Sequence, residues 1–272
     1  MKKQLFKLAA MSLAAVMSIG MLTGCGTNDA TGGNDNVEAT ATPAATDGVL
    51  IMGTNAAFPP FEFTTTDGLL GEFDGIDVAI ALEIAKSVNK ELQIEDMEFD
   101  GLLGAVQTGK IDMAVAGMTA DDERRKSVDF SDTYFTASQV MVVAADNEDI
   151  TSAEDLKNNK KVGVVIGYTG DTIVTEDLQI DESNITRANR GIDIVQDVKN
   201  GKLDAVVIDS ATGKALAEKT GLKVVEDSSV FDTEEYAIAV AKGNTELLES
   251  INKVLAEMKE NGTILELAEK YN

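Results

Sequence analysis

The chain uses one pattern twice, first in Ala105-Val-Gln-Thr-Gly-Lys-Ile-Asp-Met-Ala-Val-Ala-Gly117 and again in Asp197-Val-Lys-Asn-Gly-Lys-Leu-Asp-Ala-Val-Val-Ile-Asp209. Each copy reads as the end of a helix, a Gly-Lys turn, an aspartate and an apolar strand. A pattern of this length that occurs twice predicts two lobes of similar topology, each built around its own sheet.

The sequence around both copies alternates apolar strands with amphipathic helices. This is the rhythm of an α/β fold, in which helices cover a mostly parallel sheet. In the first half we expect strands at 49–54, 92–94 and 111–116 and helices at 77–89 and 101–108. The pattern restarts with a strand at 161–166, and the chain ends with a strand at 236–241 and two helices within 247–271, joined at Asn261-Gly262.

The predicted topology locates a binding site. In open α/β sheets, ligands bind at the carboxyl ends of the strands. The loops at those ends begin at Asn55 and Gly117 in the first half and at Gly167 and Asp209 in the second. If the two lobes face each other, these four loops converge on one cleft, which is where pockets are commonest.

The first 47 residues precede the predicted fold. Residues 1–24 have a basic start and then an apolar run too short to span a bilayer, as in a secretory signal peptide. Leu22-Thr23-Gly24-Cys25 looks like a bacterial lipobox, which predicts that Cys25 is lipidated and becomes the new N-terminus. An ordinary signal peptide followed by an unrelated cysteine is the alternative. Residues 25–47 are rich in Thr, Ala, Gly and Asn, so we expect a disordered tether.

The composition excludes several classes of function. Without residues 1–24 the chain has 20 basic and 47 acidic residues, a net charge of −27, which argues against binding to nucleic acid or anionic lipid. Cys25 is the only cysteine, so no disulfide framework is expected. The chain has no histidine, the commonest general base and metal ligand. It also has no phosphate loop and no calcium loop, so neither metal nor cofactor is expected.

Three positions at the expected cleft could carry charge recognition, and each has a structural alternative. Arg124 could take a carboxylate with its guanidinium fork, or pair with the acids around it. Asp209 ends an apolar strand and needs a cationic partner, which could be a ligand ammonium group or a lysine. The loop Tyr168-Thr-Gly-Asp171 opens a helix and could present N–H groups to an anion, or Thr169 or Asp171 could cap that helix.

The loop Asn55-Ala-Ala-Phe-Pro-Pro-Phe-Glu-Phe63 holds two of the three prolines and three of the nine phenylalanines. Proline fixes φ and stiffens the loop, so an aromatic side chain there can be held in place before a ligand binds. We expect Phe58 to form a wall of the pocket and Phe61 and Phe63 to pack in the core.

The order of motifs resembles a known family. The motifs are Phe58-Pro-Pro-Phe-Glu-Phe63, Gly71-Glu-Phe-Asp-Gly-Ile-Asp77, Asp112-Met-Ala-Val-Ala-Gly-Met-Thr119 with Glu123-Arg124, Val128-Asp-Phe-Ser-Asp132, Lys161-Val-Gly-Val164, Gly167-Tyr-Thr-Gly-Asp171 and Asn261-Gly-Thr263. Together they resemble the amino-acid-binding proteins of ABC importers (extracellular solute-binding proteins, family 3), of the glutamine-binding and lysine/arginine/ornithine-binding types. The resemblance covers essentially the whole chain after the tether.

The resemblance implies the two-lobed periplasmic-binding-protein-like fold (type II). Residues 48–135 and 237–272 then form lobe 1 and residues 136–236 form lobe 2, joined by hinge strands near 134–138 and 234–237. It also implies a mechanism, closure of the lobes around one free amino acid, which is then delivered to a membrane permease. We expect a monomer with a lipid anchor on Cys25, on the extracellular or periplasmic face of the cell membrane.

The resemblance also implies roles for individual residues. Arg124 would hold the ligand α-carboxylate, with an N–H group near Thr169 assisting. Gly117 and Thr119 would help to hold both backbone charges, and Asp209 would bind the α-ammonium group. The side-chain pocket would use Asn55, Phe58, Phe99, Val165, Tyr168 and Ile208. Relatives that bind basic ligands tend to carry an acid where this chain has Asn55, and glutamine-binding relatives have polar or charged residues at Val165 and Ile208, so we expect a neutral ligand.

Two other functions fit the same fold. Dehydratases of prephenate or arogenate resemble this family but need an acid in the pocket that assists departure of the leaving group. A sensory ectodomain would bind an amino acid in the same way, but no transmembrane helix or signalling domain is expected after the fold. A transporter-associated binding protein, and not an enzyme, remains the main prediction.

Overall fold

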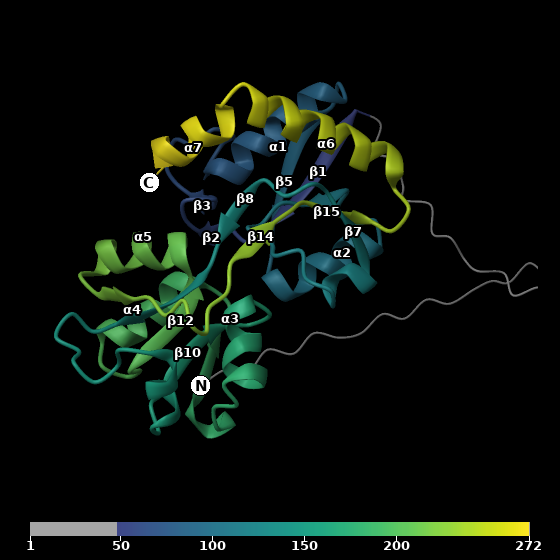
Figure 1. Ribbon diagram of the computed structural model, residues 1–272. Coiled ribbons are helices and arrows are strands. Elements are labelled where there is room, and N and C mark those ends of the chain that lie inside the picture. Colours follow the sequence, from purple (N-terminus) through teal and green to yellow (C-terminus); the bar gives the residue numbers. More distant parts are fainter. Residues whose placement is uncertain (1–47, 272) are drawn as a thin grey trace, which may run out of the picture. The chain divides into compact units, whose positions relative to one another are not determined.

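The computed structural model describes residues 48–271. Cys25 and the predicted signal peptide and tether lie outside the described residues. Two five-stranded sheets organise this part of the chain, one in each of two lobes (Figure 1). No described helix is both long enough and apolar enough to span a bilayer.

The first lobe contains the sheet β5-β1-β6-β15-β7. Its strands are β1 (Val49–Thr54), β5 (Glu91–Asp96), β6 (Met113–Ala114), β7 (Val128–Phe130) and β15 (Ala239–Ala241). The helices of this lobe are α1 (Ile76–Ser87), α2 (Leu102–Gln107), α6 (Thr245–Glu260) and α7 (Thr263–Tyr271). The loop 55–63 contributes β2 (Ala57–Phe58) and most of β3 (Glu62–Thr64) to a small sheet, which β4 (Phe73–Asp74) completes.

The second lobe contains the sheet β11-β10-β12-β9-β13. Its strands are β9 (Gln139–Val143), β10 (Val162–Val165), β11 (Ile185–Ala188), β12 (Ala205–Asp209) and β13 (Lys223–Val225). The helices of this lobe are α3 (Thr169–Thr172), α4 (Gly191–Lys199) and α5 (Ser210–Thr220).

Both sheets are mostly parallel, as the sequence predicts. In the first lobe only β15 runs against its neighbours, and in the second only β9 does. Each of these antiparallel strands follows directly after a segment in which the chain crosses from the other lobe. The reversed strand in each sheet is therefore a consequence of the crossing.

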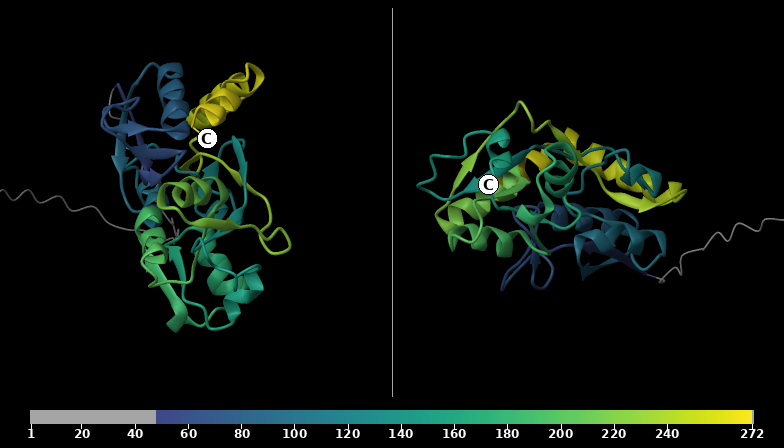
Figure 2. Two further views of the ribbon diagram at one scale, coloured as in Figure 1. Left: turned by 90° about the vertical axis from the view of Figure 1, so that its left-hand side faces the viewer. Right: turned by 90° about the horizontal axis from the view of Figure 1, so that it is seen from below.

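The two crossings run side by side as β8 (Phe135–Ala137) and β14 (Glu234–Tyr236), which pair antiparallel in a sheet of their own (Figure 1). The predicted strand 236–241 is thus divided: it ends the crossing at Tyr236 and restarts at Ala239 as β15. In the ribbon views of Figure 2, the blue and yellow segments build one lobe and the green segments the other. The C-terminal helices α6 and α7 pack beside α1 in the first lobe.

Aromatic side chains fill the space between the crossing strands and the first lobe. The Phe61 ring is completely buried and meets the rings of Phe135 and Tyr236 edge-on, at centroid distances of 4.8 and 5.2 Å. Phe61 is therefore a core residue, as expected. Phe63 is only half-buried, and its ring lies 6.1 Å from that of Tyr271. The core prediction for Phe63 is wrong, because side chains alternate along β3 and Glu62 takes the buried side.

Candidate functional site

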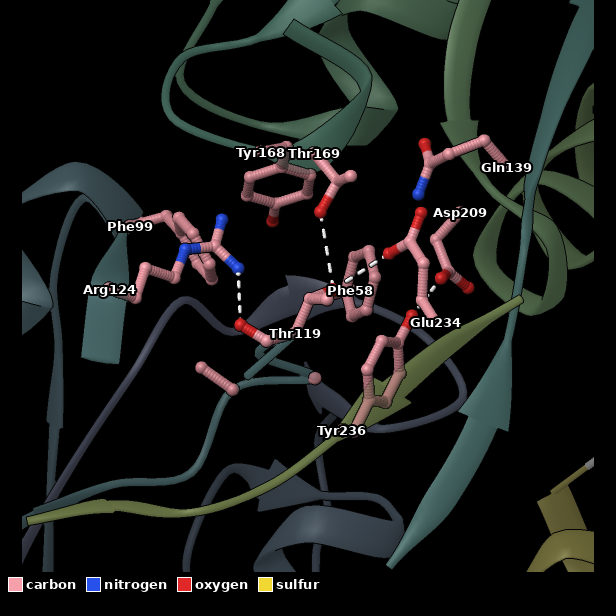
Figure 3. A pocket seen from close by; sticks show the side chains of 12 residues that line it. Phe58, Phe99, Thr119, Arg124, Gln139, Tyr168, Thr169, Asp209, Glu234 and Tyr236 are labelled. Atoms are coloured by element: carbon pink, nitrogen blue, oxygen red, sulfur yellow. Dashed lines mark hydrogen bonds between the residues drawn. The ribbon is translucent and has the colours of Figure 1, made fainter. Parts of the chain in front are cut away.

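A small cavity lies where the two lobes meet (Figure 3). Its volume is about 20 Å³, room for about one water molecule. Side chains and loops from both lobes line it: Phe58, Phe99, Ala116, Gly117, Thr119, Arg124, Gln139, Tyr168, Thr169, Asp209, Glu234 and Tyr236. The lobes are closed on each other, so a ligand reaches this place only when they separate.

Arg124 forms the cationic end of the cavity. It lies in a 3₁₀ turn, Arg124–Lys126, and its side chain is 12% exposed. Nη1 donates to the carbonyl oxygen of Thr119 at 2.8 Å, and Nη2 donates to that of Gly167 in the other lobe at 3.0 Å. Burial lowers the pKa of Arg124, while the charge of Asp121 opposes the shift. Each terminal nitrogen carries a second N–H group, and this pair can bind a carboxylate.

Asp209 and Glu234 form the acidic end. Asp209 ends β12, is 2% exposed and accepts a hydrogen bond from the N–H group of Ala211 at 3.1 Å. Tyr236 donates its hydroxyl proton to the same carboxylate. Burial, and then the nearby charge of Glu234, raise the pKa of Asp209 to about 8. Two adjacent acids facing one cavity favour a cationic group between them, because it relieves both burial and repulsion.

Thr119 connects this acidic end to the second lobe. Its hydroxyl donates to Oε2 of Glu234 at 2.7 Å and lies 3.2 Å from the hydroxyl oxygen of Thr169 (Figure 3). A hydroxyl has one proton, so Thr169 is the donor in the second contact. Two main-chain hydrogen bonds join the loop that contains Thr119 to the crossing segment at β14. The Ala120 N–H group donates to the Glu235 carbonyl oxygen, and the Ala237 N–H group donates to that of Met118.

Two glycines allow the loops to approach the cavity. Gly117 has a φ of +53°, and a Cβ atom there would lie 2.5 Å from Cε1 of Phe58. Gly167 has a φ of +76°, and its Cβ would lie 3.2 Å from that of Asp100 in the first lobe. A side chain at either position would meet backbone strain, and at Gly117 it would also clash with the Phe58 ring.

A buried pair of acids supports the Gly117 loop from below. Asp77 Oδ2 accepts from the Gly117 N–H group and from the Tyr134 hydroxyl, both at 2.8 Å. Burial raises the pKa of Asp77 to about 6, and burial followed by the charge of Asp77 raises that of Glu62 well above its usual range. Both Glu62 oxygens and Asp77 Oδ1 lack other hydrogen-bond partners among the described residues. One proton shared between Glu62 and Asp77 gives a partner to Asp77 Oδ1 and to one of the two Glu62 oxygens.

Most of the predicted ligand contacts lie together. The cavity lining includes eight of them: Phe58, Phe99, Gly117, Thr119, Arg124, Tyr168, Thr169 and Asp209. Asn55 is buried outside the lining, where Nδ2 donates to the Met97 carbonyl oxygen at 2.8 Å and Oδ1 accepts from the Tyr168 hydroxyl at 3.1 Å.

Two further pocket predictions are wrong. Val165 and Ile208 are buried in the core and do not line the cavity. Successive residues of a strand point to opposite faces, so Ile208 points away from the cavity whereas Asp209 points into it.

Neither Thr169 nor Asp171 caps α3 with its side chain. The Thr169 hydroxyl contacts that of Thr119, and the Asp171 carboxylate binds Arg187 at 2.9 Å.

Sequence reasoning missed four lining residues, Ala116, Gln139, Glu234 and Tyr236. Glu234 and Tyr236 lie on the predicted second hinge strand, and an acidic residue in a strand that borders the cleft was the available signal. Gln139 lies opposite Asp209 in the antiparallel pair β9–β12. That register is not visible in a single sequence, because β9 precedes β12 by more than sixty residues.

The cavity therefore carries a cation at one end, acids at the other and aromatic rings between. This arrangement is complementary to a small zwitterion. The described residues contain no group of three or more acids, histidines or cysteines able to hold a metal ion.

Comparisons with known proteins identify the family. The model of the bacterial extracellular solute-binding proteins, family 3, matches residues 50–272. A probable histidine-binding protein of Neisseria gonorrhoeae is 35% identical over 234 residues, covering 85% of this chain and 86% of its own.

Two solved structures are also similar. An ancestral arginine-binding protein bound to glutamine has a TM-score of 0.75 and 43% identity, over 82% of this chain and 97% of its own. An ancestral amino-acid-binding protein, described as a precursor of cyclohexadienyl dehydratase, has a TM-score of 0.73 and 35% identity, over 82% of this chain and 95% of its own. The chain belongs to family 3 of the bacterial extracellular solute-binding proteins.

Proposed function

We propose that this protein is the substrate-binding component of an amino-acid ABC importer. It closes its two lobes around one free L-amino acid with a neutral side chain and delivers it to a membrane permease. The opposition of Arg124 to Asp209 and Glu234 across one buried cavity is the observation that carries the proposal. The α-carboxylate binds Arg124 and the α-ammonium group binds the acids, so every amino acid offers both contacts.

Closure follows from where these groups lie. Arg124 and Thr119 belong to the first lobe, and Asp209 and Thr169 to the second. A ligand makes both sets of contacts only when the lobes are shut, so binding shifts the population towards the closed form. The strands β8 and β14 are the hinge in this proposal, and the lobes they join are residues 48–135 with 237–272 and residues 136–236.

The location of the protein is part of the proposal. A lipid on Cys25 and the tether that follows would keep the receptor near the permease, on the outer or periplasmic face of the membrane. This rests on the sequence of residues 1–47 alone. Replacing Cys25 with serine and measuring the membrane-bound fraction tests it, and an unchanged membrane-bound fraction contradicts it.

A thermal-shift screen tests ligand binding. The purified protein is heated with each of the twenty amino acids, cystine and ornithine in turn. We expect one or a few neutral amino acids to raise the melting temperature. Tight binding of arginine or lysine would contradict the neutral assignment, and no shift with any compound would contradict the whole proposal.

A dehydratase is the second candidate. Asp209 has a pKa of about 8, so it holds a proton at neutral pH and could donate it to a departing hydroxyl group. Prephenate or arogenate would then lose water and carbon dioxide as its ring becomes aromatic. Incubation with each compound and detection of phenylpyruvate or phenylalanine decides between the two functions. Turnover that is lost in Asp209→Asn would favour the enzyme.

A further inference from the structure

Tyr168 occupies an aromatic slot of the opposite lobe. Its ring meets those of Phe58 and Phe99 edge-on, with centroid distances of 5.3 Å at 89° and 4.6 Å at 65° (Figure 3). Phe58 and Phe99 belong to the first lobe, whereas Tyr168 follows β10 in the second. The Tyr168 side chain therefore enters the first lobe from across the cavity, and the residue is only 8% exposed.

A hydrogen bond fixes the far end of this ring. The Tyr168 hydroxyl donates to Oδ1 of Asn55 at 3.1 Å. The amide group of Asn55 is itself held, since Nδ2 donates to the Met97 carbonyl oxygen at 2.8 Å. Asn55 is 1% exposed. The polar group at the end of the slot is thus bound by the protein's own tyrosine.

The walls of the slot are also fixed. Phe58 stacks on Phe61 at 5.6 Å and lies against Gly117, where even a Cβ atom would collide with it. Phe99 lies under the Arg124 guanidinium group at 5.3 Å. Because neither wall can move without disturbing the charged site, space for a larger ligand side chain has to come from Tyr168.

We propose that Tyr168 determines specificity by size. Its ring fills the slot between Phe58 and Phe99 and its hydroxyl binds Asn55, so the receptor selects amino acids with small neutral side chains, such as glycine, alanine and serine. A larger side chain has to expel the tyrosine, break both ring contacts and leave the Asn55 oxygen unpaired. This inference rests on the proposed function, and it narrows the ligand class.

Calorimetry on the wild type and two variants tests the proposal. The ligands are glycine, alanine and serine on one side and glutamine, leucine, phenylalanine and arginine on the other. We expect the wild type to bind the small group at least about tenfold more tightly, since displacing an aromatic contact and a hydrogen bond costs that much or more. Tyr168→Ala should reverse or abolish the preference by opening the slot.

Tyr168→Phe is the matched control. It keeps the ring and loses only the bond to Asn55, so the preference for small side chains should persist. A Tyr168→Ala profile identical to that of the wild type would overturn the proposal. So would a wild type that binds leucine or glutamine more tightly than alanine, a result that leaves the proposed function intact. If the wild type binds no free amino acid, the proposed function fails as well. The wild-type ranking decides the question even if Tyr168→Ala does not fold.

Discussion

Arg190 of the second lobe and Asp96 of the first form an ion pair, with Nη2 3.0 Å from Oδ2. Neither residue lines the cavity. Asp96 is also bound within its own lobe, since its Oδ1 accepts a hydrogen bond from the Ala56 N–H group at 2.9 Å. The pair joins the lobes at a point separate from the ligand contacts.

Arg190→Ala should weaken ligand binding only slightly. The Arg190 side chain is 42% exposed, and exposed ion pairs contribute on the order of 0.2–1 kcal/mol, a loss of about 1.4- to 5-fold in affinity. The loss should shrink at high salt because screening already weakens the pair in the wild type. Titration at low and high ionic strength measures it. A 100-fold loss would show that this contact is instead a main determinant of closure.

Arg124→Ala should abolish most amino-acid binding while the protein still folds. Removing one partner of a buried charge pair costs on the order of 2–5 kcal/mol, roughly 30- to several-thousand-fold in affinity. Arg125→Ala is the matched control, since Arg125 is exposed and donates to the Ala120 carbonyl oxygen away from the cavity. Calorimetry in which both variants bind like the wild type would remove Arg124 from the proposed site.

Ligand affinity should rise with pH between about pH 6 and 8. The pKa of Asp209 is raised to about 8, so the carboxyl group is largely protonated at neutral pH. Binding an ammonium group requires the ionised form, and the proton leaves when the ligand binds. Affinity should therefore increase by up to about tenfold per pH unit and level off above pH 8.

Asp209→Asn should bind weakly and lose this pH dependence. Calorimetry in two buffers of different ionisation enthalpy counts the protons released. Uptake of a proton, or no exchange near pH 7, would contradict the assignment of Asp209 as the ammonium partner.

Glu62→Gln should stabilise the protein at alkaline pH. The folded-state pKa of Asp77 is about 6, above its usual 3.8, so folding favours the protonated form. That contribution is fully present below about pH 4 and is lost as pH rises through 6, a change on the order of 3 kcal/mol for this group. The amide group that this substitution introduces donates to Asp77 at any pH, without needing a shared proton.

Urea unfolding at pH 5 and pH 8 measures this effect. We expect the variant to gain on the order of 1–3 kcal/mol over the wild type at pH 8, and less at pH 5. Glu72→Gln, an exposed carboxyl in the same region, is the control and should change neither value. If Glu62→Gln is less stable than the wild type at pH 8, the two acids do not share a proton.

The sequence by itself determined the architecture. The two copies of the helix, Gly-Lys turn and strand pattern lead to β6 and β12, which lie in different sheets as predicted. Periodicity is a local property, so a strand such as β1 or a helix such as α1 could be predicted from its own residues. Gly117, Gly167 and Asp209 were found in the same way, because the carboxyl end of a strand can be read from the strand itself.

Only the tertiary structure decided which side chains meet. Gln139 faces Asp209 through a strand register, Glu234 reaches Thr119 from a crossing strand, and Val165 and Ile208 point into the core. The position of Tyr168 was also decided by the tertiary structure. Its ring lies in the aromatic slot of the opposite lobe, and its hydroxyl donates to the side-chain amide oxygen of Asn55, a residue that the sequence analysis assigned to ligand binding. These pairings depend on the direction of each side chain and on how two separately folded lobes meet, and neither is encoded in any short stretch of the chain.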